Sequence, residues 1–239
     1  MSKTMTREQG DGEAAALDQL AREDAGSRAQ FLKMVGGAGA AGALAIFVAA
    51  CGGDDEEDTS TPSGSSDSTG GSDSGGGSKG DIEIVNYALT LEFLEADFYK
   101  QVLASGEVKN KQVGEVAKEI YENELEHVEA LTATVEQLGG KPAKAPVTNF
   151  EEVLAGGEAM ILETAASVEN LGAAAYLGQA GNIKNKEILA AALSIHTVEA
   201  RHAAVLNQVV GKTIVPDGAF AKPATMEEVL MTVKPFIKA

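Results

Sequence analysis

The chain has 239 residues, and its 36 Asp and Glu against 19 Lys and Arg give a formal net charge of −17. A chain this acidic, with no basic stripe, is a poor match for nucleic acid, so no nucleic-acid partner is expected. The single cysteine, Cys51, excludes an internal disulfide and any cysteine-rich metal site.

Residues 1–50 have the layout of an export signal. The run from Met34 to Ala50 carries no charge, is rich in Ala and Gly, and follows Arg28 and Lys33. A basic flank, an apolar core and small residues at the end are typical of a secretory signal. The final Val48-Ala49-Ala50-Cys51 resembles a bacterial lipobox, in which the cysteine is acylated and becomes the new N-terminus.

This resemblance implies an exported protein with a lipid on Cys51, anchored to the outer face of the cytoplasmic membrane. The stretch Ser27-Arg28-Ala29-Gln30-Phe31-Leu32-Lys33 also resembles a twin-arginine signal, but Ala29 stands where the second arginine belongs. The Sec and Tat export routes therefore both stay open. The alternative is a short single-pass anchor in which Cys51 is incidental.

A linker is expected at 51–80, between the leader and a folded domain at 81–239. Residues 52–80 hold Gly, Ser, Thr, Asp and Glu, one Pro, one Lys and nothing large and apolar. Such a segment cannot bury enough surface to offset its ordering entropy, so we predict disorder. As a flexible coil it would span roughly 30 Å, which keeps the domain close to the membrane.

The domain reads as a duplicated helical hairpin. Residues 106–113 align with 181–188 at an offset of 75, and residues 150–154 align with 226–230 at an offset of 76. We predict four long helices, at about 82–104, 111–138, 157–179 and 185–210.

Short turns make the first two and the last two of these helices antiparallel pairs. The connection between the pairs is long enough to run the length of the bundle. A short C-terminal helix should begin at a capping box formed by Thr225 and Glu228. The prediction is an all-α four-helix bundle of two hairpins joined by a long crossover.

Helical projection separates one glutamate on each long helix from the rest. On the second helix Glu124 falls on the stripe of Ile120 and Leu131, whereas the other six glutamates face the opposite side. The same projection places Glu92, Glu169 and Glu199 on the apolar stripes of their own helices. We therefore expect one buried carboxylate from each helix.

Two histidines complete the pattern, because His127 and His202 each follow a buried glutamate by three residues. Ionised carboxylates in an apolar core are very unfavourable unless they are paired or bound to metal. Two divalent ions would balance four of them, and a Glu and His donor set without thiolate suits iron or manganese, with zinc also open. The predicted ligands are Glu92, Glu124, His127, Glu169, Glu199 and His202. The alternative is a bundle that has lost its metal and keeps these glutamates protonated.

Other polar residues lie close to this pattern. Glu95 faces inward three residues after Glu92, while its repeat counterpart is Gly172, so Glu95 is a candidate acid, extra ligand or group through which metal passes inward. Tyr99 and Tyr176 lie two turns beyond Glu92 and Glu169 and are candidate hydrogen-bond donors or redox-active neighbours, with plain core packing as the alternative. His196 is expected to pack near the site or to support a ligand.

Four segments carry a resemblance to the ferritin-like superfamily, and the nearest likeness is to its exported branch, which includes desiccation-related proteins. This resemblance implies that Glu124 and Glu199 bridge two metal ions, that Glu92 and Glu169 are terminal ligands, and that each histidine binds one ion. The segments are Leu91-Glu92-Phe93-Leu94-Glu95-Ala96-Asp97-Phe98-Tyr99, Glu124-Leu125-Glu126-His127, Glu169-Asn170-Leu171-Gly172-Ala173-Ala174-Ala175-Tyr176 and Val198-Glu199-Ala200-Arg201-His202-Ala203-Ala204.

The resemblance leaves the reaction open, because the superfamily covers several chemistries. The leading hypothesis is a membrane-tethered protein with two iron or manganese ions that oxidises Fe(II) or reduces O2 or H2O2 in envelope stress protection. A metal-free structural or interaction module is the alternative, and a hydroxylase-type oxidase would need an apolar cavity and a reductase partner. A homodimer is allowed, and a storage cage is disfavoured because every subunit would carry a lipid and a tether.

Overall fold

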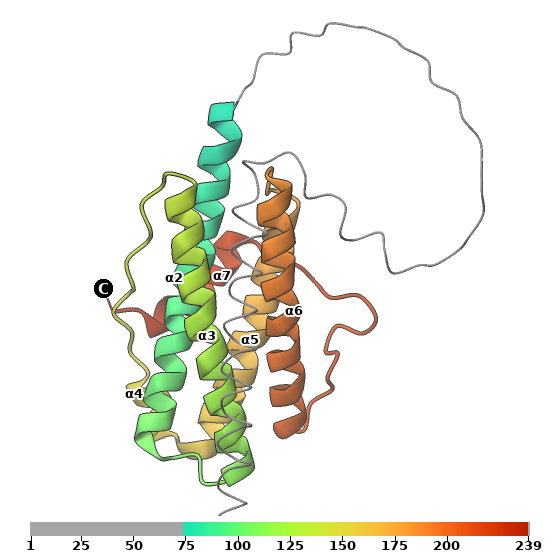
Figure 1. Ribbon diagram of the computed structural model, residues 1–239. Coiled ribbons are helices and arrows are strands. Elements are labelled where there is room, and N and C mark those ends of the chain that lie inside the picture. The colour runs from blue at the N-terminus through green and yellow to red at the C-terminus, as the bar shows by residue number, and fades with distance from the viewer. Residues whose placement is uncertain (1–73, 239) are drawn as a thin grey trace, which may run out of the picture.

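The computed structural model describes residues 74–238, which form four long and three short helices (Figure 1). The long helices are α2 (Ser74–Ser105), α3 (Lys111–Gln137), α5 (Gly157–Ala180) and α6 (Lys186–Val209). The short ones are α4 (Glu151–Ala155), α7 (Met226–Val233) and the 3-10 helix η2 (Lys234–Phe236). Residues 74–238 contain no strand, so the predicted all-α class is confirmed.

The predicted leader at 1–50, the lipidation site Cys51 and the linker up to residue 73 lie outside the described residues. Of the helices in the described part of the chain, none combines the length and the apolar character needed to cross a membrane.

The first long helix begins at Ser74, eight residues before the predicted start and inside the predicted linker. Asp81 is the residue that ties this end of α2 to the bundle: its two carboxylate oxygens accept hydrogen bonds of 2.8 Å from the backbone N–H groups of Lys184 and Asn185. Once α2 is held there, the helix can extend back to Ser74, because each added residue forms a helical hydrogen bond and no new nucleation step is needed.

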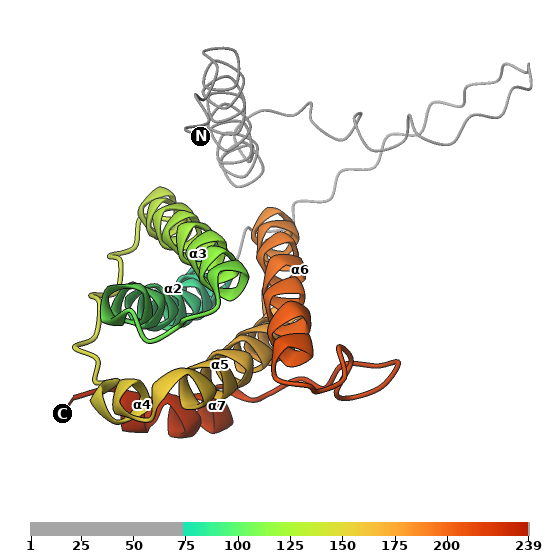
Figure 2. The same cartoon turned by 90° about the horizontal axis from the view of Figure 1, so that it is seen from below.

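The repeat seen in the sequence is also present in the structure. α2 packs along α3 and α5 packs along α6, and the end-on view shows the two hairpins side by side (Figure 2). Asn110 caps α3 and Asn185 caps α6, and each side chain accepts from the second and third backbone N–H groups that follow it. The two caps are 75 positions apart, so the same asparagine capping interaction begins the second helix of each hairpin.

The crossover and the C-terminal segment cover the outside of α2 and α5. Asn149 donates its backbone N–H to Phe236, and the rings of Phe150 and Phe236 stack with centroids 5.3 Å apart. The predicted capping box of Thr225 and Glu228 is present at the start of α7. α7 buries Val229 against the core, which closes the bundle beside α5.

The apolar core is divided into two clusters along the bundle axis. One contains Phe98, Ile120 and Leu206, and the other contains Leu131 and Ile195. On every long helix the inward-facing glutamate lies between a residue of one cluster and a residue of the other. The fold therefore encloses a polar layer between two apolar ones.

Candidate metal centre

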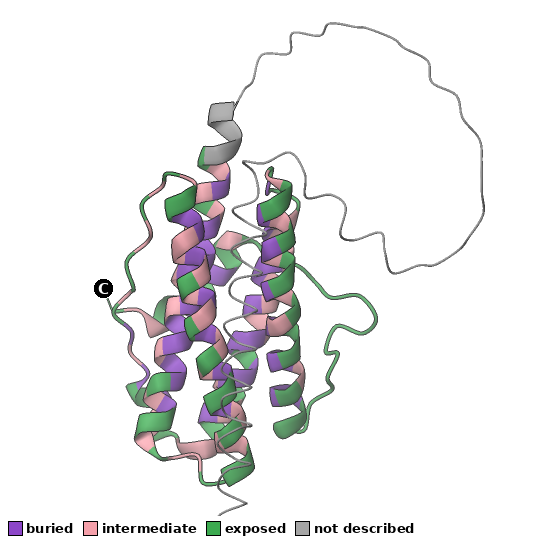
Figure 3. Ribbon diagram, viewed as in Figure 1, coloured by how far each residue is buried: buried purple, intermediate pink, exposed green. Residues whose placement is uncertain are grey.

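The six predicted ligands meet in this polar layer. The four glutamates, one from each long helix, have no exposed surface, and the two histidines are buried beside them. Buried residues lie along the inner faces of the long helices (Figure 3). The residues brought together are Glu92, Glu124, His127, Glu169, Glu199 and His202.

The other glutamates of α3 lie elsewhere. Glu126 is half-buried, and the remaining five are exposed, as the helical projection predicted. The contrast on one helix identifies Glu124 as the carboxylate that the fold encloses, while its neighbours interact with solvent. The five exposed residues are Glu115, Glu119, Glu122, Glu129 and Glu136.

The ligand atoms fall into two overlapping groups that could each hold a metal ion. One group adds Glu92 and His127 to the pair Glu124 and Glu199, and the other adds Glu169 and His202 to the same pair. Within each group the ligand atoms lie within 4.8 Å of one another. Glu124 and Glu199 are the members that both groups share.

Both histidines direct Nδ1 into the cluster. Nδ1 of His127 lies 3.1 Å from Oε2 of Glu92, 3.1 Å from Oε2 of Glu124 and 3.2 Å from Oε1 of Glu199. Nδ1 of His202 lies 3.1 Å from Oε1 of Glu124 and 3.1 Å from Oε2 of Glu169. One ring nitrogen of each histidine thus faces carboxylate oxygens from at least two helices.

Three oxygens of the shared glutamates meet no donor in good hydrogen-bond geometry among the described residues: Oε1 of Glu124 and both carboxylate oxygens of Glu199. Nδ1 of a histidine does lie 3.1 to 3.2 Å from each of the two Oε1 atoms, so Oε2 of Glu199 is the one without a nitrogen beside it. A buried oxygen without a partner is costly, and native proteins rarely keep one without a function. These oxygens belong to the two residues that both groups share. A cation at this point would therefore meet carboxylate oxygens that the protein does not satisfy well by itself.

The cluster binds protons tightly in the absence of metal. Burial and the charge of Glu92 raise the pKa of Glu124 to about 7, and burial with the charge of Glu124 raises the pKa of Glu199 well above its usual range. Burial lowers the pKa of His202, but its bonds to Glu124 and Glu169 outweigh this and raise the pKa to about 10. Protons thus occupy positions that metal ions would compete for.

Each tyrosine bonds a glutamate of the opposite hairpin. Tyr99 on α2 donates its hydroxyl to Oε1 of Glu169 at 2.6 Å, and Tyr176 on α5 donates to Oε1 of Glu92 at 2.5 Å. Both hydroxyls are buried, and burial and the carboxylate charges raise their pKa well above the usual range. The tyrosines therefore stay protonated and orient the two glutamates that the metal groups do not share.

Glu95 is also in the layer, facing Gly172. The residue is buried, and burial with the charges of Glu199 and Glu92 raises the pKa of its carboxyl well above the usual range. A methyl group on Gly172 would lie 2.9 Å from Oε1 of Glu95 and 2.9 Å from Oε2 of Glu199. Gly172 therefore makes the space that Glu95 occupies, which accounts for the asymmetry between the repeats.

Two further polar residues differ in their relation to the site. His196 donates Nδ1–H to the backbone carbonyl of Ala173 at 3.0 Å, so it links α6 to α5 and stays out of both metal groups. Asn123, which sequence reasoning missed, places Oδ1 3.0 Å from Nε2 of His202. The available signal was an uncharged amide among the glutamates of α3, immediately before Glu124.

An all-α bundle with a buried Glu and His cluster that could hold metal defines a ferritin-like protein. The chain belongs to the ferritin-like domain family, because the family model described as Ferritin-like domain matches residues 80–212, more than half of the chain. The match covers both hairpins and ends before α7. A search of curated proteins finds no match to this chain.

Proposed function

We propose that the domain binds two iron or manganese ions and uses them to oxidise Fe(II) or to reduce H2O2 or O2. The observation that carries the proposal is the convergence of four fully buried glutamates and two histidines into two groups that share Glu124 and Glu199. In addition, Oε2 of Glu199 meets no donor among the described residues, whereas a structural glutamate in a bundle that had lost its metal would be expected to satisfy both of its oxygens.

The donor set fits such ions in number and in charge. Four carboxylates and two imidazoles give each group four residues, two of which are common to both. Two divalent cations would balance the four glutamate charges without protonating the histidines. Oxygen and imidazole donors without a thiolate suit iron and manganese.

The residues have distinct roles in this proposal. Glu124 and Glu199 would be the shared ligands, Glu92 and Glu169 would each bind one ion, and His127 and His202 would bind through Nδ1. When bound, two such ions supply two electrons on going from the divalent to the trivalent state, and H2O2 with two protons takes them up to give two water molecules. Tyr99 and Tyr176 hold the terminal carboxylates, and Glu95 is the neighbouring group placed to give or take a proton or to act as an extra ligand.

The proposed location follows from the leader. The apolar run before Cys51 and the small residues at positions 48–50 support export and lipid anchoring at the outer face of the cytoplasmic membrane. We place the domain there on its linker, with Fe(II) and O2 or H2O2 as small-molecule partners and a role in envelope stress protection. Membership of the desiccation-related branch and a homodimer belong to the same proposal.

The test is elemental analysis of protein purified without chelator and again after anaerobic Fe(II) loading. The expected result is about two iron or manganese ions per chain. Glu124→Gln with Glu199→Gln should abolish uptake, because it removes both shared ligands. The matched control is Glu119→Gln with Glu122→Gln, which changes two exposed glutamates of α3 and should leave uptake intact.

A metal-free role is the second candidate, and one observation favours it. The two histidines already lie 3.1 to 3.2 Å from the glutamate oxygens, so protonated imidazoles offset part of the buried charge. A folded chain that takes up no metal under anaerobic loading would establish a structural or interaction module. Equal loss of uptake in both double variants would overturn the assignment of Glu124 and Glu199 as shared ligands.

A further inference from the structure

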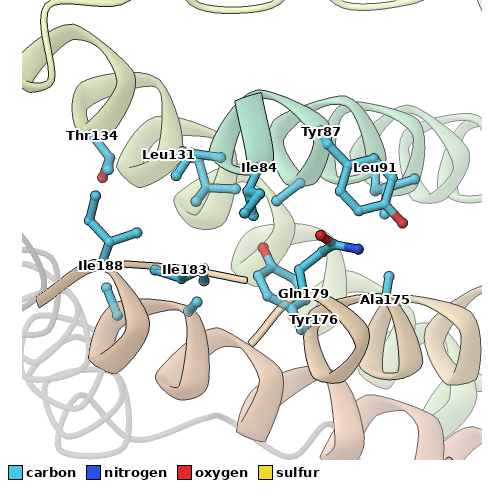
Figure 4. A pocket seen from close by; sticks show the side chains of 14 residues that line it. Ile84, Tyr87, Leu91, Leu131, Thr134, Ala175, Tyr176, Gln179, Ile183 and Ile188 are labelled. Carbon is cyan, nitrogen blue, oxygen red and sulfur yellow. The ribbon is translucent and has the colours of Figure 1, made fainter. Parts of the chain in front are cut away.

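A small cavity lies inside the bundle, one to two helical turns from the metal centre. Its volume is about 30 Å³, and its walls come from all four long helices and from Ile183 in the turn between α5 and α6. Ala88 lies one turn before Glu92, and Leu131 lies one turn after His127. We refer to this space as the inner cavity (Figure 4).

The inner cavity and the metal centre share a wall. Tyr176 lines the cavity with its ring while its hydroxyl donates to Glu92. A molecule in the cavity is therefore separated from a proposed ligand by one side chain. On the outer side Ile84 and Ala192 are only partly buried, so the cavity approaches the surface between α2 and α6.

The walls are almost entirely apolar. Ten of the fourteen lining residues are aliphatic. Of the polar ones, Thr134 donates its hydroxyl to the carbonyl of Ala130, and the side-chain oxygen of Gln179 accepts from Asn182. An apolar cavity of this kind stays dry, because a buried water needs two to four polar partners.

One polar atom is left over. Tyr87 is buried, with an exposure of 7%, and its hydroxyl has no hydrogen-bond partner among the described residues. Figure 4 shows this side chain reaching from α2 toward Ala175 and Gln179 of α5. The hydroxyl is a lone donor at the edge of an apolar space.

We propose that the inner cavity binds dioxygen. This proposal rests on the proposed function and selects O2 as the oxidant that the protein takes up. The volume is about twice the 10 to 15 Å³ that one water-sized probe needs, so it suits a diatomic molecule and excludes the larger substrate of a hydroxylase. O2 is apolar, and one weak hydrogen bond from Tyr87 is the polar contact it can use.

Hydrogen peroxide fits the same space poorly. It carries two O–H donors, and both would lose their hydrogen bonds to water on entry. The polar groups of the wall are the hydroxyls of Tyr87, Thr134 and Tyr176 and the amide of Gln179, and all but Tyr87 already take part in a hydrogen bond. Leaving a buried donor unsatisfied costs about 1 to 3 kcal/mol, so peroxide should stay outside the inner cavity.

The test uses metal-free protein, so that it stands apart from metal uptake. O2 is paramagnetic and speeds the relaxation of nearby methyl groups, which NMR measures under O2 against N2. The methyl groups of Leu131 and Ile188, which line the cavity, should relax faster than those of Ile161, which is equally buried in the other apolar cluster. Equal effects at the three residues, or ordered water in the cavity, would overturn the proposal.

Two variants test whether the faster relaxation depends on the space in the inner cavity. Ala191→Val fills part of the cavity and should remove the excess relaxation, whereas Ala117→Val, an equally buried alanine of α3 outside the cavity, should keep it. In protein that takes up Fe(II), Ala191→Val should slow oxidation by O2 about tenfold and leave oxidation by H2O2 unchanged. A chain that binds no metal would refute the dinuclear function, while the methyl relaxation would still decide whether O2 enters the cavity.

Discussion

The hydroxyl of Tyr176 donates a 2.5 Å hydrogen bond to Glu92, a residue 84 positions earlier in the chain and in the other hairpin. Tyr99 makes the reciprocal contact with Glu169. Each hairpin thus supplies the donor that orients a terminal carboxylate of the other. The site depends on how the hairpins dock as well as on how each one folds.

Tyr99→Phe and Tyr176→Phe should each weaken metal binding, because the carboxylate that loses its donor is no longer held in one orientation. Removing a group that orients a ligand typically costs about 10- to 100-fold in metal affinity. Competition titration against a metal chelator measures the change. The matched control is Tyr121→Phe, at a half-buried position outside the cluster, and an equal loss there would contradict the role of the two hydroxyls.

The helix ends and the inward-facing glutamates could be predicted from the sequence. The helix ends at 111–138 and 157–179 agree with Lys111–Gln137 and Gly157–Ala180, because Asn caps and Gly stops are local signals. The buried glutamates were also predictable, since the apolar period of each helix defines its inner face. These predictions rest on residues within one helix.

The crossed tyrosine contacts were not predictable in the same way. Spacing places Tyr176 on the face of Glu169, its own helix partner, but the contact is with Glu92 on α2. That outcome depends on the axial offset between α2 and α5, which no local pattern encodes. The inner cavity could not be predicted for the same reason, because the size of a void depends on how the inner faces of the four long helices pack against one another.

Gly172→Ala should disturb the metal centre while barely changing the stability of the metal-free fold. The new methyl group would lie 2.9 Å from oxygens of Glu95 and Glu199, and both side chains would have to move. Replacing a mid-helix glycine by alanine otherwise gains about 0.5 to 1 kcal/mol. The expected result is weaker metal uptake, with a melting temperature near that of the unchanged protein.

The double variant Glu95→Ala with Gly172→Ala is the control for this prediction. Without the Glu95 carboxylate the methyl group has more space, so the gain in helix propensity should emerge as a higher melting temperature than Glu95→Ala alone. Equal melting temperatures for Glu95→Ala and the double variant would contradict a steric conflict between positions 95 and 172.

Asn123→Ala should affect one metal group more than the other. Oδ1 of Asn123 lies 3.0 Å from Nε2 of His202 and favours the tautomer with hydrogen on Nε2, which leaves Nδ1 free to bind metal. The equivalent position in the repeat is Val198, so His127 receives no matching amide. In the variant, metal titration should show a weaker affinity for one ion and a nearly unchanged affinity for the other. An equal loss of affinity for both ions would contradict this difference.

The metal-free protein should become less stable as the pH rises. The pKa of Glu124 is raised from 4.5 to about 7 and that of His202 from 6.5 to about 10 in the folded state. The folded state therefore holds more protons than the unfolded state across this interval, and the free energy of unfolding falls as pH increases. The pKa of Glu92 is lowered instead. A lowered carboxyl pKa changes the free energy of unfolding only near and below the ordinary value of 4.5, so Glu92 does not alter the trend at higher pH.

Melting curves in the presence of chelator, taken between about pH 5 and pH 9, measure this slope. The melting temperature should fall across the range. Glu124→Gln should make it less dependent on pH in the acidic half of the range, because the variant lacks one of the groups whose raised pKa causes the fall. Bound metal should reverse the trend, since metal needs the carboxylates ionised and the histidines neutral and is displaced by protons at low pH. A melting temperature that rises with pH in chelator would show that the cluster is already deprotonated and that its charge is balanced in another way.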